Sequence, residues 1–433
     1  MSANATPPWP WRMLRQFISW AKRSPKEAPK LVRHALRLFL LFEFLAGATT
    51  VAIDFLRASR TSEVASFPVT QLPSLDVAHN NLQVYTLGTE LYQDMLDAIR
   101  HAKRHVFFET FIWKNDEVGQ LFKDALIDAA KRGVHVWIIY DEIGNLVVPR
   151  KFQQMPQIST LHVLHFRILR SFFLSLRNTG TDHRKILTVD NRVGFIGGYN
   201  IGSLYATQWR DTHLRIEGPG VWELTNAFVD FWNVHRRKHH PTLPHYPSPA
   251  WDTGVTIARN EPNRFLFPVR GLYISALNRA EKQVWITSAY FVPDKDILDE
   301  LCVAAARGVD VRVLIPERSN HIAVDWVSRC YYLELLEAGV QIWLYRGAMI
   351  HAKTATVDGA WTTIGTANID RLSMTGNYEV NLEVTSKRLA AQMEQVFLND
   401  LSNSRQVTLQ EWAERPFMPR LIERLLKPLG AVL

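Results

Sequence analysis

The sequence predicts an α/β fold in which one structural unit occurs twice. Two stretches carry this prediction: "AKRGVHVWIIYDE" (130–142) and "AARGVDVRVLIPE" (305–317) both read as the end of a helix, a glycine and a buried strand. Each stretch follows a helical pattern that itself follows an apolar strand, "HVFFETFIW" or "QVWITSAYFV". We therefore expect two domains, each with its own sheet and helices.

Length and composition agree with a globular chain of two or more domains. The chain has 433 residues, of which 47% are hydrophobic and 21% charged, so that each domain can bury a core of its own. The two cysteines, Cys302 and Cys330, cannot form a disulfide framework, which favours a reducing compartment.

The boundary between the copies is predicted from a cluster of prolines. Residues 241–252 follow "HH" and contain four prolines, which exclude regular structure and indicate a linker. We place the first domain at 64–240 and the second at 253–405.

The N-terminal segment, residues 1–63, is predicted to associate with a membrane. The net charge of the chain is +8, and residues 1–37 hold eight basic residues against Glu27 alone, interspersed with tryptophans. The apolar run "LFLLFEFLAGATTVA" (38–52) follows directly. Basic residues, tryptophans and an apolar segment together suit an anionic membrane surface better than DNA.

The apolar run itself is interpreted as a helix lying in the membrane interface. From Leu38 to Ile53 it is shorter than the ~20 apolar residues that a spanning helix needs, and it contains Glu43. A spanning helix and a helix packed in a protein core remain the alternatives.

Two further segments suit a lipid surface. The tail, residues 406–433, is basic and apolar again, and we interpret it as an amphipathic second contact with the membrane. The stretch "LHFRILRSFFLSLRNTG" (164–180) mixes aromatic residues with arginines, which fits acyl chains and headgroup phosphates, and equally fits a packed amphipathic helix.

The chemistry is predicted from a motif that also occurs twice. "TDHRKILTVDNRVGFIGGYN" (181–200) is matched by "IHAKTATVDGAWTTIGTAN" (350–368), with five positions repeated 168 residues later. These positions are His183, Lys185, Asp190, Gly197 and Asn200, and His351, Lys353, Asp358, Gly365 and Asn368. Each histidine and its lysine, two residues apart on an expected strand, would project from the same face.

This pairing of side chains suits a phosphate and argues against a metal. A lysine is a poor neighbour for a metal-binding histidine, so neither a metal nor a cofactor is expected. Lysine and asparagine can instead bind the non-bridging oxygens of a phosphodiester while one imidazole attacks phosphorus. The other imidazole, protonated, can donate to the leaving alkoxide.

Two carboxylates have the spacing expected of partners for these histidines. Asp211 and Glu379 each follow a motif histidine by 28 residues, in strand-like stretches. We therefore predict that Asp211 orients His183 and that Glu379 orients His351, each fixing the tautomer and stabilising the imidazolium.

The duplicated His-x-Lys-x4-Asp motif with its downstream Gly and Asn resembles the phospholipase D superfamily. "GGYNIG", "WRDTH", "IEGPGV", "SAYFVPD" and "NYEVNLE" resemble its bacterial cardiolipin synthase branch, over residues 80 to 400. The resemblance implies duplicated phospholipase D-like domains, each a mixed sheet flanked by helices, related by a pseudo-twofold axis. It also implies one active site at their interface, a phosphohistidine intermediate and no metal.

Carried over residue by residue, the resemblance implies a role for each motif position. His183 would be the nucleophile and His351 the general acid and later base, although the sequence leaves open an exchange of these two roles. The phosphate ligands would be Lys185, Lys353, Asn200 and Asn368. Asp190 and Asp358 complete the two catalytic motifs, and we expect them to be structural rather than chemical.

The sequence also departs from the family pattern. Gly198 and Thr366 stand where many members have serine. The two full transmembrane helices of the longer synthases are missing, so the chain resembles a short form of that branch.

The function expected from the resemblance is that of a transphosphatidylase. It would pass a phosphatidyl group through a phosphohistidine to the hydroxyl of phosphatidylglycerol, giving cardiolipin. If water accepts the group instead, the protein is a phospholipase D or a nuclease-type hydrolase. A third reading, a lipid-binding scaffold without activity, is disfavoured by the intact second motif.

The expected partners are phospholipids and an anionic membrane surface. Phosphatidylglycerol, phosphatidylethanolamine and a cytidine-activated lipid all offer the same phosphodiester. No nucleic acid is expected, because the chain beyond residue 37 is nearly neutral. We expect a peripheral or monotopic protein on the cytoplasmic face of the bacterial inner membrane.

Overall fold

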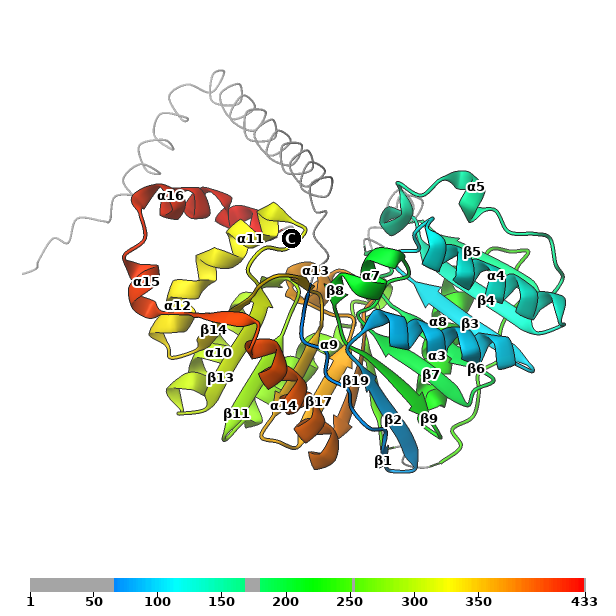
Figure 1. The fold of residues 1–433 in the computed structure, drawn as a ribbon, viewed down its shortest axis with the longest axis horizontal. Coiled ribbons are helices and arrows are strands. Elements are labelled where there is room, and N and C mark those ends of the chain that lie inside the picture. The colour runs from blue at the N-terminus through cyan, green and yellow to red at the C-terminus, as the bar shows by residue number, and fades with distance from the viewer. Residues whose placement is uncertain (1–65, 168–179, 251–253, 432–433) are drawn as a thin grey trace, which may run out of the picture. The chain divides into compact units, whose positions relative to one another are not determined.

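A computed structural model describes residues 66–167, 180–250 and 254–431, which belong to one compact unit of the chain (Figure 1). This unit contains two eight-stranded sheets, one from each half of the sequence. The predicted N-terminal membrane segment and most of the 164–180 stretch lie outside the described residues.

The first sheet has the strand order β1-β2-β9-β7-β6-β3-β4-β5, in which β3, β4 and β5 are parallel and the other neighbours antiparallel. Its strands are β1 (Leu75–Val77), β2 (Asn80–Tyr85), β3 (His105–Thr110), β4 (His135–Asp141), β5 (Leu161–Phe166), β6 (Ile186–Val189), β7 (Val193–Gly197) and β9 (His213–Glu217). Its helices are α3 (Gly88–His101), α4 (Glu117–Lys131), η1 (Ile143–Asn145), α5 (Arg150–Gln153), α7 (Ser203–Thr207) and α8 (Val221–His235).

The second sheet has the order β10-β19-β17-β16-β11-β13-β14-β20. Its strands are β10 (Thr256–Arg259), β11 (Gln283–Thr287), β13 (Asp310–Pro316), β14 (Gln341–Tyr345), β16 (Thr354–Val357), β17 (Trp361–Gly365), β19 (Val380–Thr385) and β20 (Ser404–Val407). Its helices up to the end of the sheet are η2 (Pro262–Arg264), α9 (Pro268–Arg279), α10 (Lys295–Ala306), α11 (Ile322–Ser328), η3 (Arg329–Tyr331), α12 (Tyr332–Glu337), α13 (Arg371–Thr375) and α14 (Lys387–Leu401).

The two sheets match strand by strand once β1 and β20, at opposite ends, are set aside. In spatial order, the run β2-β9-β7-β6-β3-β4-β5 of the first sheet corresponds strand for strand to the run β10-β19-β17-β16-β11-β13-β14 of the second. Corresponding neighbours are parallel or antiparallel in the same way. The duplicated α/β fold with mixed sheets is therefore confirmed.

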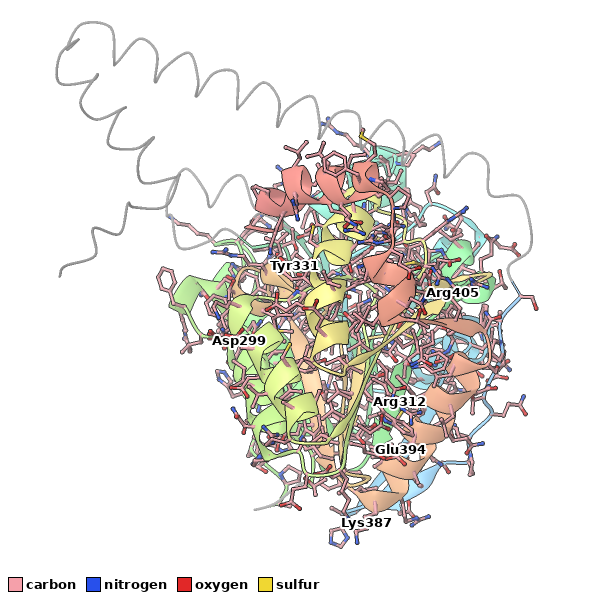
Figure 2. The ribbon with its side chains drawn as sticks, turned by 90° about the vertical axis from the view of Figure 1, so that its left-hand side faces the viewer. Asp299, Arg312, Tyr331, Lys387, Glu394 and Arg405 are labelled. Atoms are coloured by element: carbon pink, nitrogen blue, oxygen red, sulfur yellow. The ribbon has the colours of Figure 1, made fainter. Side chains whose placement is uncertain are left out.

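Each sheet is covered by helices on both faces. Successive side chains of a strand point to opposite faces of the sheet, and both sets are buried, so both faces need a covering layer. On β3, Val106 and Phe108 face the core under α3 and α4, whereas Phe107 packs with Phe228 of α8. Figure 2 shows the second half from its side, with α10, which carries Asp299, and α14, which carries Lys387 and Glu394, on opposite faces of the sheet.

An apolar cluster joins the two halves. Ile196 and Leu214 of the first sheet share it with Ile364 and Leu382 of the second, and all four are fully buried. Such a cluster stabilises the contact by the hydrophobic effect, at roughly 25 cal/mol for each Å² of apolar surface removed from water.

Short strands also cross between the halves. β8 (Trp209–Arg210) pairs in parallel with β15 (Met349–Ile350), and Asp182 forms an isolated bridge with Tyr378. A second short pair, β12 (Phe291–Val292) and β18 (Ile369–Asp370), lies within the second half. The crossing strands bring the two histidine motifs to the contact between the halves.

Residues 241–250 hold neither helix nor strand, and they are fixed to α8 by side-chain hydrogen bonds. The indole Nε1 of Trp232 donates to the carbonyl of Pro241 at 2.9 Å, and Asn226 Nδ2 donates to the carbonyl of Tyr246 at 2.8 Å. The domain boundaries drawn from the sequence remain predictions.

The tail forms α15 (Leu409–Ala413), α16 (Phe417–Leu426) and η4 (Lys427–Ala431). Trp412 packs into the core of the second half, and the guanidinium of Arg415 pairs with Glu423 at 2.6 Å. Phe417, Met418 and Leu425 remain exposed on α16, so this helix is amphipathic. In the described parts of the chain, no helix has the length and apolar character needed to cross a bilayer.

Candidate active site

The two motif histidines are held by backbone hydrogen bonds to the opposite half. His183 N donates to the carbonyl of Tyr378 at 3.1 Å, and His351 N donates to the carbonyl of Arg210 at 2.6 Å. Because these segments leave their own sheets to reach the other half, β6 begins only at Ile186 and β16 at Thr354. The histidines and lysines therefore lie just before the strands in which we predicted them.

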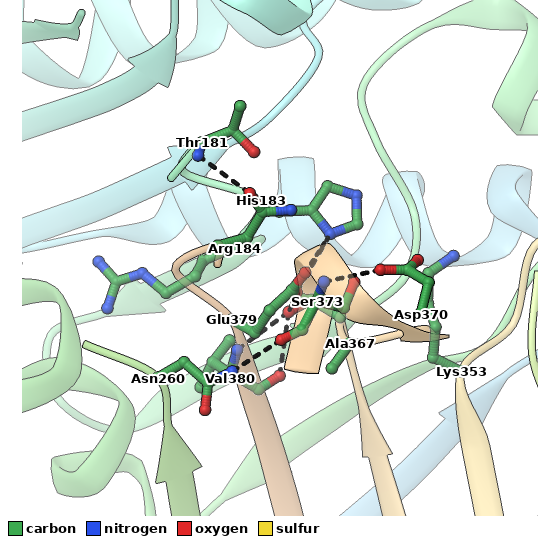
Figure 3. A network of polar contacts seen from close by, with 12 residues as sticks. Thr181, His183, Arg184, Asn260, Lys353, Ala367, Asp370, Ser373, Glu379 and Val380 are labelled. Carbon is green, nitrogen blue, oxygen red and sulfur yellow. Dashed lines mark hydrogen bonds and ion pairs between the residues drawn. The ribbon is translucent and has the colours of Figure 1, made fainter. Parts of the chain in front are cut away.

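The carboxylates contact the histidines, but in the crossed arrangement. His183 Nδ1 lies 3.0 Å and 3.1 Å from the two carboxylate oxygens of Glu379 (Figure 3). His351 Nδ1 lies 2.7 Å from Asp211 Oδ2. The predicted pairing of Asp211 with His183 and of Glu379 with His351 is wrong. Glu379 follows Tyr378 and Asp211 follows Arg210, so the backbone bonds that cross between the halves carry each carboxylate to the other half's histidine.

The two carboxylates are held differently by the residues at the matched positions 198 and 366. The Thr366 hydroxyl donates to Glu379 Oε2 at 2.5 Å. Opposite it, a Cβ at Gly198 would lie 2.1 Å from Asp211 Oδ1, so only glycine leaves room for this carboxylate. The backbone N–H of Thr212 donates to the same oxygen at 2.7 Å, which replaces the missing hydroxyl.

Both motif lysines are buried and anchored to their own histidines. Lys185 Nζ donates to the carbonyl of His183 at 2.7 Å, and Lys353 Nζ donates to that of His351. Burial lowers the pKa of Lys185 to about 7 and that of Lys353 to about 8, because a charged ammonium is poorly solvated there. An incoming phosphate anion would favour the charged form of both.

The histidines are neutral in this environment. Burial, followed by the charges of Lys185 and Lys353, lowers the pKa of His183 well below its ordinary value, and the same groups lower that of His351. A neutral imidazole whose Nδ1 faces a carboxylate presents the lone pair of Nε2, which is the form required of a nucleophile or base.

Burial acts on the carboxylates in the opposite direction. It raises the pKa of Glu379 to about 8 and that of Asp211 to about 6, while the nearby lysines partly offset the rise. Asp211 therefore keeps its charge near neutral pH more readily than Glu379 does, and the two histidines face partners of unequal basicity.

The two asparagines lie on the segments that follow β7 and β17. Asn200 Oδ1 accepts the backbone N–H of Ile112 at 3.2 Å, an orientation in which Nδ2 is the group available to a phosphate oxygen. Asn368 is also buried, and its Oδ1 has no hydrogen-bond partner among the described residues.

The motif aspartates hold turns. Asp190 accepts the backbone N–H groups of Lys103, Arg104 and His105 at 2.7–2.9 Å. Asp358 does the same at the start of β11, with three backbone N–H groups at 2.7–2.9 Å. Their carboxylates are thus engaged in fixing the loops before β3 and β11, in agreement with the structural role we expected.

Aromatic rings line the histidines, which the sequence did not reveal. The Phe111 ring lies 4.9 Å from that of His183, and Lys185 Nζ lies 5.2 Å from the Phe111 ring. The Trp209 ring lies 5.1 Å from that of His351. Trp209 lies two residues before Asp211 in "WRDTH". This closeness to a predicted site carboxylate is the signal from which the sequence could have indicated that Trp209 belongs to the site.

A buried ion pair ties Asp211 into the second half, and this too was missed. Arg210 Nη2 lies 2.7 Å from Asp400 Oδ2 and Nε lies 2.9 Å from Oδ1, and both side chains are almost fully buried. Arg210 also donates to the carbonyl of Asp211 and to the Thr212 hydroxyl. The pair fixes the segment that presents Asp211 to His351.

The arrangement brings together two neutral imidazoles, two carboxylates and two lysines from both halves. The described residues hold no group of three or more His, Cys, Asp and Glu side chains suited to a metal ion. The chemistry available to these side chains is nucleophilic attack by one imidazole, proton transfer by the other, and stabilisation of a phosphate by lysine and asparagine.

Comparison with known proteins agrees with the duplicated fold and with the family that the motif resembles. A family model described as "Cardiolipin synthase, PLD-like domain" matches residues 95–232 and 273–401, one match in each half. The major cardiolipin synthase ClsA of Bacillus subtilis (strain 168) is 34% identical over 365 residues, covering 81% of this chain and 75% of that protein. A cardiolipin synthase of Geobacillus sp. (strain WCH70) is 36% identical, covering 83% and 76%.

Solved structures show the same fold at lower identity. The phosphatidylserine synthase of Haemophilus influenzae Rd KW20 superposes with a TM-score of 0.62 at 14% identity, covering 83% of this chain and 95% of that one. The polyphosphate kinase of Porphyromonas gingivalis superposes with a TM-score of 0.52 at 13% identity, covering 84% and 57%. The resemblance to phospholipase D-like proteins is thus confirmed.

Proposed function

The chain belongs to the cardiolipin synthase family of phospholipase D-like proteins, and on this premise we propose that it transfers a phosphatidyl group to phosphatidylglycerol, forming cardiolipin. Its substrates are phospholipids, and its relatives named cardiolipin synthase support this class of reaction. The observation that carries the proposal is the pair of crossed histidine–carboxylate contacts, which set two imidazoles in one buried site.

In the first half of the reaction, His183 Nε2 attacks the phosphorus of the donor lipid. The bond from phosphorus to the headgroup oxygen breaks, and the departing alkoxide takes a proton from Nε2 of His351, which gains that proton when the anionic lipid binds. Glu379, at 3.0 Å from Nδ1, stabilises the positive charge that the phosphorylated imidazole acquires.

In the second half, His351 has become neutral and acts as a base. It removes the proton from a hydroxyl of phosphatidylglycerol, whose oxygen attacks the phosphohistidine and releases His183. Asp211, at 2.7 Å from Nδ1 of His351, stabilises the imidazolium in both protonation steps. Lys185, Lys353 and the two asparagines would hold the non-bridging oxygens throughout.

The assignment of His183 as the nucleophile follows the family motif. The His351 side chain is 4% exposed and the His183 side chain 10% exposed. The more exposed histidine suits the nucleophile, which must contact phosphorus directly, and the less exposed one suits the acid and base. An exchange of the two roles would leave the overall reaction unchanged.

We further propose that the protein works at the surface of the bacterial inner membrane, on the cytoplasmic face. The basic and apolar composition of residues 1–63 and the amphipathic α16 support a peripheral or monotopic attachment. Phosphatidylglycerol serves as acceptor, and phosphatidylglycerol, phosphatidylethanolamine or a cytidine-activated lipid serves as donor.

The test is to incubate the purified chain with phosphatidylglycerol vesicles and to identify the products by mass spectrometry. We expect cardiolipin and glycerol in equal amounts. Phosphatidic acid in place of cardiolipin would mean that water accepts the phosphatidyl group, and the protein would then be a hydrolase. Replacing His183 by Ala, with the exposed His101→Ala as control, should abolish either product.

A further inference from the structure

Three segments near His183 expose large apolar side chains to solvent. Leu146 and Val147, between β4 and α5, are 72% and 80% exposed, and Phe265 and Leu266, between η2 and α9, are 65% and 51% exposed. Leu372 of α13 is 42% exposed. Single exposed apolar residues are ordinary, but a group of them around one site marks a contact surface.

Hydrogen bonds tie each of these segments, the two loops and α13, to the backbone or side chain next to His183. Asp141 accepts the N–H of Ile143, where the first loop begins, at 2.7 Å and that of Asp182 at 2.9 Å. Asn377 N donates to the carbonyl of Leu372 at 2.6 Å, and its side chain accepts the N–H of Thr181 at 3.1 Å.

The third segment is anchored to the carboxylate partner of His183. Asn260 N donates to the carbonyl of Glu379 at 3.0 Å, and Asn260 Nδ2 donates to the carbonyl of Ser373 at 2.8 Å. Figure 3 shows Asn260, Ser373 and Glu379 together beside His183. The segments that carry the apolar tips are therefore anchored beside the histidine to which we assign the nucleophilic role.

Phe265 also has an unusual backbone. Its φ is 55°, in the left-handed region that aromatic residues rarely adopt, and two hydrogen bonds between Glu261 and Leu266 close the turn around it. Such a conformation costs free energy, and here it holds an aromatic ring out in solvent instead of burying it. A strained turn that displays an apolar ring is typical of a recognition loop.

The exposed charges beside these tips are basic. Arg150 and Lys151 follow Val147 closely and are exposed, and Arg371 precedes Leu372 and is exposed as well. The acidic neighbours, Glu142 and Glu261, are only partly exposed, and each is paired with an arginine. An apolar surface with basic residues at its edge complements an anionic phospholipid bilayer, in which acyl chains lie beneath negatively charged headgroups.

We propose that these tips form a docking rim that rests on an anionic phospholipid bilayer and opens the site toward it. The docking rim consists of Ile143, Leu146, Val147, Phe265, Leu266 and Leu372. The inference rests on the proposed function, because a lipid substrate can reach His183 without leaving the bilayer only if this face meets the membrane. The docking rim also specifies which face of the protein meets the membrane, which attachment through the N-terminal segment or α16 does not.

The first test follows the rim directly and needs no activity. A nitrobenzoxadiazole label is placed at Phe265→Cys in a chain with Cys302→Ala and Cys330→Ala, and a matched chain carries it at Val303→Cys, on α10 and 48% exposed. With phosphatidylglycerol vesicles, emission should rise at least about twofold and shift to the blue at position 265, and stay unchanged at 303. Equal responses at both positions, or none at 265, would overturn the proposal.

The same label separates a membrane from a protein partner. A blue shift at 265 that grows with protein concentration in the absence of vesicles would show that a second copy covers the rim, and the bilayer would be excluded as its occupant. Phosphatidylcholine vesicles should give a weaker response than phosphatidylglycerol, because the basic edge needs anionic headgroups.

The second test measures turnover. Phe265→Ser with Leu266→Ser should slow the reaction on long-chain phosphatidylglycerol vesicles by about tenfold, since two apolar anchors are lost, and leave that on a monomeric short-chain lipid within about twofold. Val303→Ser with Leu409→Ser is the control. An equal loss on both substrates would mean that the loop shapes the site itself. If the parent chain forms no cardiolipin, the proposed function fails while the label still decides the docking.

Discussion

Because each carboxylate contacts the histidine of the other half, the structure predicts which histidine variant each carboxylate variant will resemble. Contacts within each half would predict the opposite match. Glu379→Gln removes the carboxyl group that faces His183, and Asp211→Asn removes the one that faces His351. Each carboxylate variant should therefore reproduce the defect of the histidine from the other half of the chain. With an activated aryl phosphodiester, Glu379→Gln should slow the covalent burst, which His183→Ala should abolish, whereas Asp211→Asn should keep it, as should His351→Ala.

The magnitude follows from the burial of these contacts. Glu379 is 0% exposed and lies at 3.0 Å and 3.1 Å from Nδ1, so water cannot replace the lost carboxyl group. A hydrogen bond to a charged group contributes about 1.5–3 kcal/mol, and about 1.4 kcal/mol corresponds to a factor of ten in rate. We expect the burst rate to fall by roughly 10- to 100-fold in Glu379→Gln.

Rapid-quench measurement of the first turnover, with the two histidine variants as standards, is the assay. The comparison does not depend on which histidine is the nucleophile, because each carboxylate variant is matched to a histidine variant. If Glu379→Gln instead resembled His351→Ala, the carboxylates would serve the histidines of their own halves, and the crossed arrangement would be refuted.

Three further predictions concern stability, pH and packing. Asp400→Ala should lower the free energy of unfolding by about 3–5 kcal/mol in urea titrations because it leaves Arg210 buried without its partner, whereas Arg210→Met with Asp400→Leu should recover most of it. Burial lowers the pKa of Lys185 to about 7, so this lysine loses its charge as pH rises. The value of kcat/KM for a soluble phosphodiester should therefore fall between about pH 7 and pH 9. A flat pH profile would contradict this prediction. Gly198→Ser, which introduces the serine of the family pattern that the sequence resembles, should lower kcat by about tenfold because its Cβ would meet Asp211 Oδ1. Undiminished activity would show that the carboxylate can move aside.

The duplicated fold could be predicted because both copies repeat the same local signals. A helix end, a glycine and a buried strand recur at 130–142 and 305–317, and these became α4 with β4 and α10 with β13. Local periodicity and turn chemistry decide such elements, and they are read directly from the sequence.

The pairing inside the site could not be predicted in the same way. Asp211 and Glu379 have equal spacing from the histidines of their own halves, and this spacing is the same whether the contacts stay within a half or cross. The choice depends on how the halves pack, through the backbone bonds of His183 and His351 to the opposite chain segment. Spacing along the chain carries no information about that contact.

The asymmetry of the site was visible in the sequence only as two substitutions. Gly198 and Thr366 differ at matched positions, and the structure gives the reason: one position must admit the carboxylate of Asp211, and the other supplies a hydroxyl to Glu379. Arg210 and Tyr378 differ likewise at matched positions, and Arg210 pairs with a buried acid, Asp400. These partners lie far away in the sequence, so propensity and pattern could not indicate them.

The charges in the site also account for the proton that the reaction needs. Burial lowers the pKa of both histidines well below its ordinary value, so both imidazoles are neutral beside the two buried lysines. A phosphodiester brings one negative charge into this enclosed space, where electrostatic interactions are stronger than in water. Burial, and after it the charges of Lys353 and Lys185, hold the pKa of His351 low, and the added negative charge acts against the two lysines and raises that pKa. We therefore expect His351 to take up, together with the substrate, the proton that the leaving alkoxide needs.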